Sequence, residues 1–315
     1  MILTADPRAN GSRMGWGLAI ALSVVAGTCL DAAVHPVSID LRGRSFSPGE
    51  LLRVEMISSE PIESLEGKFL GRQVFLVRDP GALPGFERWS GWAMIALDEE
   101  PGLAAVEARG RTKSGRAVVG TRAVRIESRA FPRELLKVAP RFVEPPPEVR
   151  ERLARERRKL ESLYHTRRPA PPPREAFVRP VPGEPTSVFG TRRIYNGQPR
   201  APHPGLDLRA ASGTPVRSSG EGRVALAENL YYSGATVIVD HGGGLFTLYA
   251  HLSELLVREG DEIGIAQLIG RSGSTGRVTG PHLHWGAKIG DLPFDPTALL
   301  DDDLFPPWGG RGAAQ

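Results

Sequence analysis

Histidines gather in the last third of this sequence, and their spacing points to chemistry. Five of the seven histidines fall within residues 203–284, and two of them, His282 and His284, are two positions apart. On a β-strand, side chains at positions i and i+2 project from the same face, roughly 6–7 Å apart. Such a pair suits one metal ligand beside one acid–base group, while Leu283 and Trp285 would point the other way into apolar packing.

A second motif adds a carboxylate to this set. In His203-Pro204-Gly205-Leu206-Asp207 the proline and glycine disfavour a helix, so Asp207 is expected to begin a strand after a tight loop. Two imidazoles and one carboxylate suffice to bind Zn²⁺ and leave a fourth position for water, which is typical of catalytic rather than structural zinc. The alternative for both motifs is a polar or pH-sensitive surface patch. A lone cysteine, Cys29, excludes a CxxC metal or redox motif and an intramolecular disulfide.

These motifs carry a resemblance to a known family. Together with Tyr249-Ala250-His251-Leu252 and Gly280-Pro281-His282-Leu283-His284, the first motif resembles, in order and spacing, the lysostaphin/LytM-type zinc metallopeptidases, which cut peptide bridges in peptidoglycan. The resemblance covers roughly residues 186–296 and includes Val188-Phe189-Gly190 and the glycine-rich stretch 270–276. It implies one Zn²⁺ per chain, and peptidoglycan peptide stems and cross-links as the substrate.

The resemblance also implies a role for each matched residue. His203, Asp207 and His284 would ligate the zinc ion, and His251 and His282 would flank the metal-bound water and the substrate carbonyl. Zinc lowers the pKa of a bound water to about 7, and a neutral imidazole can take its proton while a second one hydrogen-bonds the oxyanion. Which of the two histidines is the general base stays open.

The remaining histidines and one tyrosine are expected to be structural. His241 follows a strand-like run and precedes three glycines, which favours a hydrogen-bonding role. His35 and His165 lie far from the motifs and are expected to be solvated. Tyr195, just before the first motif, could contact substrate, although packing is the favoured interpretation.

Residues 182–300 must supply the elements that position these side chains. Strand-forming runs separated by glycines predict an antiparallel β-sheet, with strands at Gly222–Glu228, Thr236–His241, Leu245–His251 and His282–Ile289. Three aspartates and a glycine-rich stretch then predict a flexible tail over residues 301–315.

The first half of the chain predicts a further β-domain and a linker. Short alternating runs over residues 34–128 predict a small, immunoglobulin-like β-sandwich, with Trp89 and Trp92 in its core. Residues 129–181 form a proline-rich linker with a helix at about 148–166, whose narrow apolar stripe should lie along a neighbouring domain. The sequence therefore predicts an all-β protein with two β-domains joined by this helical linker. One hypothesis is that the helix or the first domain covers the catalytic groove until a partner displaces it.

The N-terminal segment predicts export. Two arginines precede the uncharged run Met14–Leu30, so residues 1–33 are expected to be a signal peptide cleaved within 27–33, with a retained membrane anchor or lipidation at Cys29 as alternatives. Contact with a membrane is expected only through this segment if it stays uncleaved. The formal net charge of +4, from 40 basic and 36 acidic residues, gives no argument for a nucleic-acid partner.

The sequence thus favours an exported zinc endopeptidase of the periplasm or cell envelope that hydrolyses peptidoglycan cross-links with a metal-activated water. A catalytically silent or autoinhibited LytM-like regulator of cell-wall amidases is one alternative, and a non-enzymatic envelope-binding protein is another. An envelope regulatory protein is a candidate partner. The bond cleaved stays open between D-Ala–diaminopimelate and a glycine bridge.

Overall fold

The computed structural model describes residues 34–79, 84–166, 173 and 177–305. The expected signal or anchor segment, with Cys29, lies outside these residues. Within them, none of the helices combines the length and the apolar character needed to cross a membrane.

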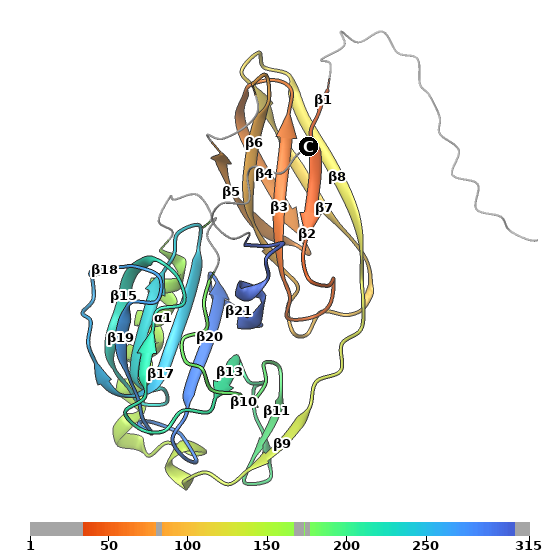
Figure 1. Cartoon of the computed structure of the whole chain (residues 1–315). Coiled ribbons are helices and arrows are strands. Elements are labelled where there is room, and N and C mark those ends of the chain that lie inside the picture. Colours follow the sequence, from red (N-terminus) through yellow and green to blue (C-terminus); the bar gives the residue numbers. More distant parts are fainter. Residues whose placement is uncertain (1–33, 80–83, 167–172, 174–176, 306–315) are drawn as a thin grey trace, which may run out of the picture. The chain divides into compact units, whose positions relative to one another are not determined.

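An eight-stranded sheet forms the N-terminal part of the described chain (Figure 1). Its strand order is β1-β8-β7-β4-β5-β6-β3-β2, antiparallel except for the parallel pair β1–β8. The strands are β1 (His35–Pro36), β2 (Ser38–Arg42), β3 (Leu51–Ser58), β4 (Ile62–Phe69), β5 (Arg72–Asp79), β6 (Glu87–Met94), β7 (Gly102–Thr112) and β8 (Ala117–Ile126).

Strand β5 joins the two halves of this sheet. Its first residues pair with β4, up to Val74, and the residues from Phe75 onward pair with β6. This arrangement agrees with the predicted small β-sandwich, because β5 pairs within both of its sheets and connects them in one hydrogen-bonded path. Alternation along a strand shows which face is buried but not which strand it pairs with, so the sequence could not predict this connection.

The linker contributes strand β9 (Arg133–Leu136), the 3₁₀ helices η1 (Pro140–Phe142) and η2 (Pro147–Val149), and helix α1 (Arg150–His165). Proline opens η2, which leads directly into α1 and places the helix two residues inside the predicted range. In a small sheet, β9 pairs in parallel with β11 (Arg192–Tyr195), which also pairs with β12 (Gln198–Pro199).

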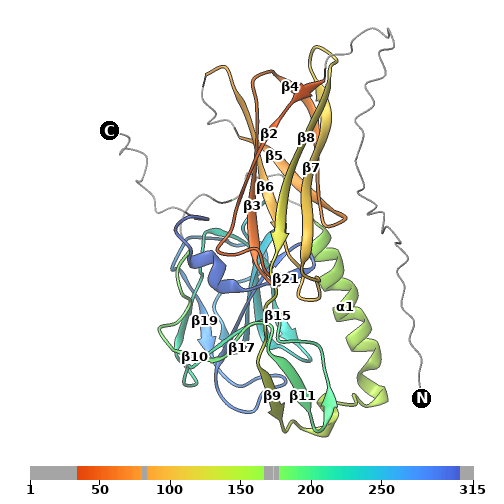
Figure 2. The same ribbon diagram turned by 90° about the vertical axis from the view of Figure 1, so that its right-hand side faces the viewer.

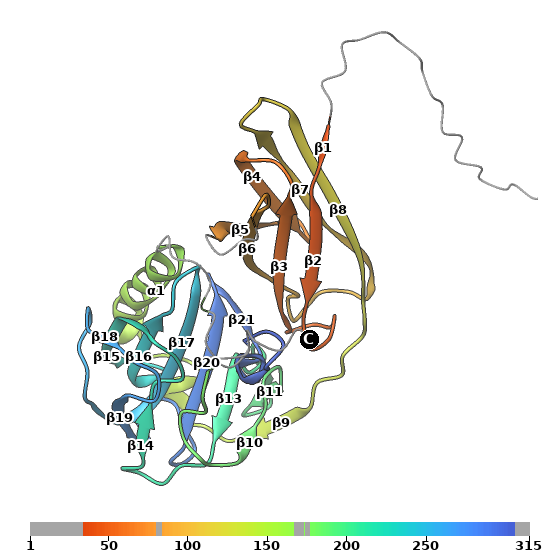
Figure 3. The same ribbon diagram turned by 45° about the horizontal axis from the view of Figure 1, so that its top comes forward.

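A second large sheet, of ten strands in the described residues, carries the sequence motifs (Figure 3). The order is β10-β13-β20-β17-β16-β15-β18; in addition, β14 pairs with β19, β19 with β17, and β21 with β20. The strands are β10 (Pro185–Ser187), β13 (Gly205–Leu208), β14 (Pro215–Arg217), β15 (Gly222–Leu230), β16 (Gly234–Asp240), β17 (Leu245–Leu255), β18 (Glu262–Ile263), β19 (Leu268–Ser272), β20 (Leu283–Ile289) and β21 (Leu292–Phe294), followed by the 3₁₀ helix η3 (Pro296–Leu300). The prediction of a mostly β protein is confirmed.

The two faces of this sheet pack against different partners. Leu283 and Trp285 of β20 are fully buried in the main core, so His284 between them projects from the opposite face. On that opposite face, Tyr164 of α1 packs against Phe246 of β17, and Figure 2 shows α1 running along the sheet. The helix therefore covers one part of the face that carries His284.

Both large sheets contribute to one hydrophobic core. Trp92 of β6 lies in the same buried cluster as Trp285, and its ring centroid is 5.0 Å from that of Phe305. The predicted flexible tail is therefore wrong for Leu304 and Phe305, which are 0% and 1% exposed. Because three aspartates precede these two apolar side chains, the polar composition of the segment predicted a flexible tail and not a contribution to the core.

Candidate metal centre

Two neighbouring strands and one loop bring the three expected metal ligands together. Asp207 on β13 and His284 on β20 are directly opposite residues of an antiparallel pair. His203 lies in the loop before β13 and is completely buried. Asp207 is the third residue of β13, which begins at Gly205 directly after Pro204, so the strand starts two residues earlier than the sequence predicts.

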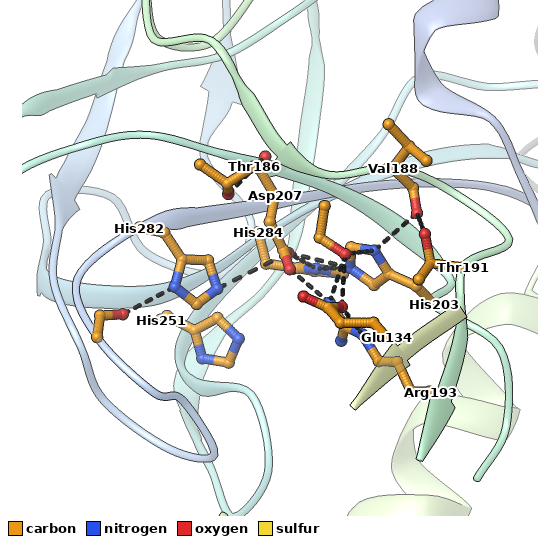
Figure 4. Close-up of polar contacts among 12 residues, drawn as sticks. Glu134, Thr186, Val188, Thr191, Arg193, His203, Asp207, His251, His282 and His284 are labelled. Atoms are coloured by element: carbon orange, nitrogen blue, oxygen red, sulfur yellow. Dashed lines mark hydrogen bonds and ion pairs between the residues drawn. The ribbon is translucent and has the colours of Figure 1, made fainter. Parts of the chain in front are cut away.

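Their donor atoms converge on one point (Figure 4). The Oδ1 atom of Asp207 lies 3.0 Å from Nε2 of His203 and 2.8 Å from Nδ1 of His284. The two imidazole nitrogens are 2.9 Å apart. Side-chain exposures of 0%, 9% and 12% for His203, Asp207 and His284 keep the cluster almost free of solvent.

Hydrogen bonding and burial set the protonation of this cluster. Nδ1 of His203 lies 3.1 Å from the carbonyl oxygen of Val188. A carbonyl only accepts, so Nδ1 carries the proton and Nε2 presents its lone pair to the cluster. Burial lowers the pKa of His203 to about 4, which keeps the ring neutral at pH 7. Burial alone would raise the pKa of Asp207, but the contacts of its carboxylate with the two histidines hold that pKa well below its usual range.

This donor set fits a zinc ion. A neutral imidazole lone pair and a carboxylate oxygen 3.0 Å apart would repel each other unless a proton or a cation lies between them. Two nitrogen donors and one oxygen donor are ligands that zinc accepts, and three protein ligands leave a position open for water or substrate. A metal held by these three residues would keep the open position that is typical of a catalytic site.

The other two histidines lie beside the cluster. The ring centroids of His251 and His282 are 5.0 Å apart, and Nε2 of His282 is 3.7 Å from Oδ1 of Asp207. Each ring donates its Nδ1 proton to a backbone carbonyl 2.8 Å away, that of Thr275 for His251 and that of Gly280 for His282. Nε2 is therefore the atom that either ring can use to exchange a proton with a substrate.

A β-bulge turns His251 toward this site. Strand β17 carries one extra residue relative to β16 between Tyr249 and Leu252, and His251 within the bulge has a φ of 64°. A positive φ is uncommon for a residue other than glycine and occurs at bulges that redirect a side chain. Burial, reinforced by the neighbouring His284 and His282, lowers the pKa of His251 to about 3. The ring is consequently neutral at pH 7.

A pocket of about 290 Å³ opens onto the cluster. The linker residues Glu134, Leu136 and Val138 form part of its wall, and α1 contributes no lining residue within the described chain. The structure therefore places the β9 segment, and not the helix, beside the groove.

Two arginines in this pocket were not singled out from the sequence. Nη2 of Arg193 donates to Oδ2 of Asp207 at 2.5 Å. The guanidinium carbon of Arg277 lies 5.0 Å and 4.6 Å from the ring centroids of Tyr195 and Tyr232. Tyr195 is only 4% exposed and also lines the pocket, so both packing and contact with substrate stay open for it. Arginines are frequent in this sequence, so only their position in the fold distinguishes these two.

The histidines outside the site fall into two groups. The ring of His241 lies within hydrogen-bonding distance of the carbonyl oxygen of Glu221 and the hydroxyl of Thr247, consistent with the expected structural role. His165 is exposed. His35, expected to be solvated, is instead 5% exposed and lies 2.9 Å from the hydroxyl of Ser58. Its ring lies between Ser58 and Glu60, which are distant from it in sequence.

Comparison with known proteins gives the relationships of the second half of the chain. Residues 201–296 match the sequence profile of peptidase family M23. Over 111 residues the chain is 46% identical to the peptidoglycan DD-endopeptidase ShyA of Vibrio cholerae. The aligned segment covers 35% of this chain and 26% of ShyA. Over 97 residues the chain is 43% identical to the DD-carboxypeptidase/endopeptidase Mpg of Neisseria meningitidis, covering 31% and 22%. The chain thus matches about a quarter of the length of these curated relatives.

A solved structure extends the likeness beyond the matched residues. A crystal structure from Pseudomonas aeruginosa, described as an M23 peptidase, superposes with a TM-score of 0.61 at 28% sequence identity. The superposition covers 82% of this chain and 96% of that one. The resemblance to the lysostaphin/LytM-type peptidases is therefore confirmed, and the likeness in fold includes residues outside the family match.

Proposed function

We propose, from the premise that residues 201–296 form a domain of peptidase family M23, that this protein is an exported zinc endopeptidase that hydrolyses peptide cross-links of peptidoglycan. The observation that carries the proposal is the convergence of three donor atoms, from His203, Asp207 and His284, within 3.0 Å of one another beside two further histidines. A structural site would have closed with a fourth protein ligand.

The chain's own residues would divide the reaction between them. His203, Asp207 and His284 would hold zinc, which when bound polarises a carbonyl and makes water a nucleophile at neutral pH. His251 and His282 would supply the acid–base steps through Nε2, because Nδ1 of each ring is held by a backbone carbonyl. A neutral imidazole can accept a proton from attacking water and return it to the departing amine.

The relatives favour one substrate class. The name of ShyA specifies peptidoglycan DD-endopeptidase activity, and that of Mpg specifies DD-carboxypeptidase/endopeptidase activity. We extend that specificity to this chain and place its substrate in the stem peptides and cross-links of the wall, and its location in the periplasm or cell envelope. A silent amidase regulator is disfavoured, because the resemblance implies that such regulators lack some of the metal ligands.

Digestion of purified peptidoglycan by residues 34–315 tests the proposal. Released muropeptides are read by mass spectrometry for wild type, for His282→Ala and for a matched control, His165→Ala, which removes an exposed histidine at the end of α1. We expect cleavage within the peptide cross-link by wild type and the control, its loss on chelation and its recovery with zinc. His282→Ala should lose a factor of about 10²–10⁴ in turnover while keeping its metal.

Two results would contradict the proposal. One is cleavage that survives complete removal of the metal. The other is a wild-type protein that holds one zinc and yet releases no fragment, which would favour the regulator.

A further inference from the structure

The linker reaches the metal site through strand β9, which lies outside the residues that match the family. Strand β9 pairs in parallel with β11, and this register sets Glu134 opposite Arg193. Figure 4 shows both side chains directed toward Asp207. A segment from the linker thus contributes a carboxylate to the surroundings of an expected metal ligand.

A continuous chain of polar contacts leads from Glu134 to the ligands. Oε2 of Glu134 accepts a hydrogen bond from the Ser187 hydroxyl at 3.1 Å and lies 3.5 Å from Nε of Arg193. Nη2 of Arg193 donates to the same hydroxyl at 3.2 Å and to Oδ2 of Asp207 at 2.5 Å. The Ser187 hydroxyl is in turn 3.4 Å from Nδ1 of His203.

We propose that Glu134 is a positioning residue of the metal site, which acts through Arg193 to hold the Asp207 carboxylate in its ligating orientation. This assignment rests on the proposed zinc function of the same cluster. Groups that hydrogen-bond to metal ligands fix the ligand orientation, and their loss typically weakens metal binding 10–100-fold. Here the outer group belongs to the linker and not to the family domain.

Charge explains why a carboxylate is needed at this position. The Arg193 side chain is 14% exposed and lies against Asp207, so its positive charge opposes the approach of a cation. Among the described residues, Glu134 and Asp207 are the two carboxylates in ion-pair distance of Arg193. When Asp207 shares its charge with zinc, Glu134 is left to balance the guanidinium.

The test measures zinc affinity directly, by competition of the metal-free chain 34–315 with a zinc-binding dye. We expect Glu134→Gln, which keeps the side-chain shape and removes the charge, to bind zinc about tenfold more weakly than wild type. Glu144→Gln makes the same change at an exposed glutamate of the same linker and should bind as wild type does. Circular dichroism of each variant verifies that the fold is kept.

A double-mutant cycle separates action through Arg193 from a general structural effect. Arg193→Gln should weaken zinc binding, because losing the hydrogen bond that orients Asp207 costs more than removing the opposing charge gains, and adding Glu134→Gln to it should change the affinity by less than twofold. A tenfold further loss in the double variant would overturn the proposed route, and equal affinities of Glu134→Gln and wild type would overturn the role of Glu134. If wild type itself binds no zinc, the proposed function fails and this assignment fails with it.

Discussion

At the scale of single residues, the candidate metal site depends on a glycine as well as on His203, Asp207 and His284. Gly205 on β13 faces β20, and a Cβ at this position would lie 2.5 Å from the carbonyl oxygen of Trp285 and 2.8 Å from the ring of His284. Real Cβ atoms do not approach backbone this closely, so β13 and β20 can pair at this distance only with glycine. The residue two positions before Asp207 therefore controls how near that ligand comes to His284.

A side chain at position 205 would disturb the close packing of β13 on β20. Gly205→Ala should force β13 away from β20, lower the free energy of unfolding by about 1–3 kcal/mol, and weaken zinc binding by displacing His284. Urea denaturation and dye competition measure the two effects. Gly264→Ala is the control, because its Cβ would meet only the Gln267 side chain at 4.0 Å. Unchanged zinc affinity in Gly205→Ala would refute the argument.

The clustered residues lie in motifs that the sequence shows, whereas the residues behind them do not. His203 and Asp207 belong to one short motif and His284 to another, and the family resemblance, not spacing alone, distinguished His284 from His282 as the expected ligand. Arg193 and Glu134 come together only through the parallel pairing of β9 with β11. Nothing in the local pattern of either segment encodes that partner.

At the scale of elements, α1 is held to the ten-stranded sheet by polar contacts of its N-terminal half, at Arg152 and Glu156, and by apolar packing of its C-terminal half. Tyr164 is 5% exposed and packs edge-on against Phe246 at a centroid distance of 5.3 Å, with Leu226 and Ile238 in the same cluster. The ammonium of Lys288, on β20, lies 4.2 Å from the Tyr164 ring centroid. The helix therefore braces the strand that carries His284.

Truncation of Tyr164 would remove the ring contact between α1 and Phe246. Tyr164→Ala should lower the free energy of unfolding by about 3–5 kcal/mol, because a large buried ring leaves a cavity. Tyr164→Phe keeps the ring and should unfold close to wild type. Chemical denaturation compares the three proteins, and equal losses for both substitutions would show that the ring packing is not what holds the helix.

The helix shows how far sequence reasoning extends for an element. Flanking prolines predicted its position within two residues, and its apolar stripe predicted a neighbouring surface. The stripe could not identify that surface, because many strands offer a matching apolar face. Because the sequence did not identify that surface, the helix could be hypothesised to cover the catalytic groove. In the structure the β9 segment, and not the helix, lines the pocket.

At the scale of the whole described chain, an ionic network joins the eight-stranded sheet, the linker and the ten-stranded sheet. Asp295, which follows β21, accepts hydrogen bonds from Arg129 of the linker at 3.0 Å and from Thr297. Arg44, which follows β2, lies 3.3 Å from the same carboxylate, and both arginines also pair with Glu50. Trp92 in the shared core and this network both connect the two large sheets, whose described residues belong to one compact unit.

The last prediction follows from the charge of Asp295. Burial raises its pKa, but hydrogen bonds from Thr297 and the charges of Arg44 and Arg129 outweigh burial and lower it. A carboxyl with a lowered pKa in the folded state stabilises the fold above its unfolded pKa of about 3.9 and loses that contribution as the pH falls through the folded value.

Asp295→Asn should therefore lower the free energy of unfolding by about 1.5–3 kcal/mol at pH 7 and by progressively less as the pH falls below about 4. Urea denaturation at pH 7 and pH 3 measures both, with Asp302→Asn, an exposed neighbour, as the control. An equal cost at both pH values would show that the asparagine perturbs packing, and that the ionic link between the two sheets contributes little to stability.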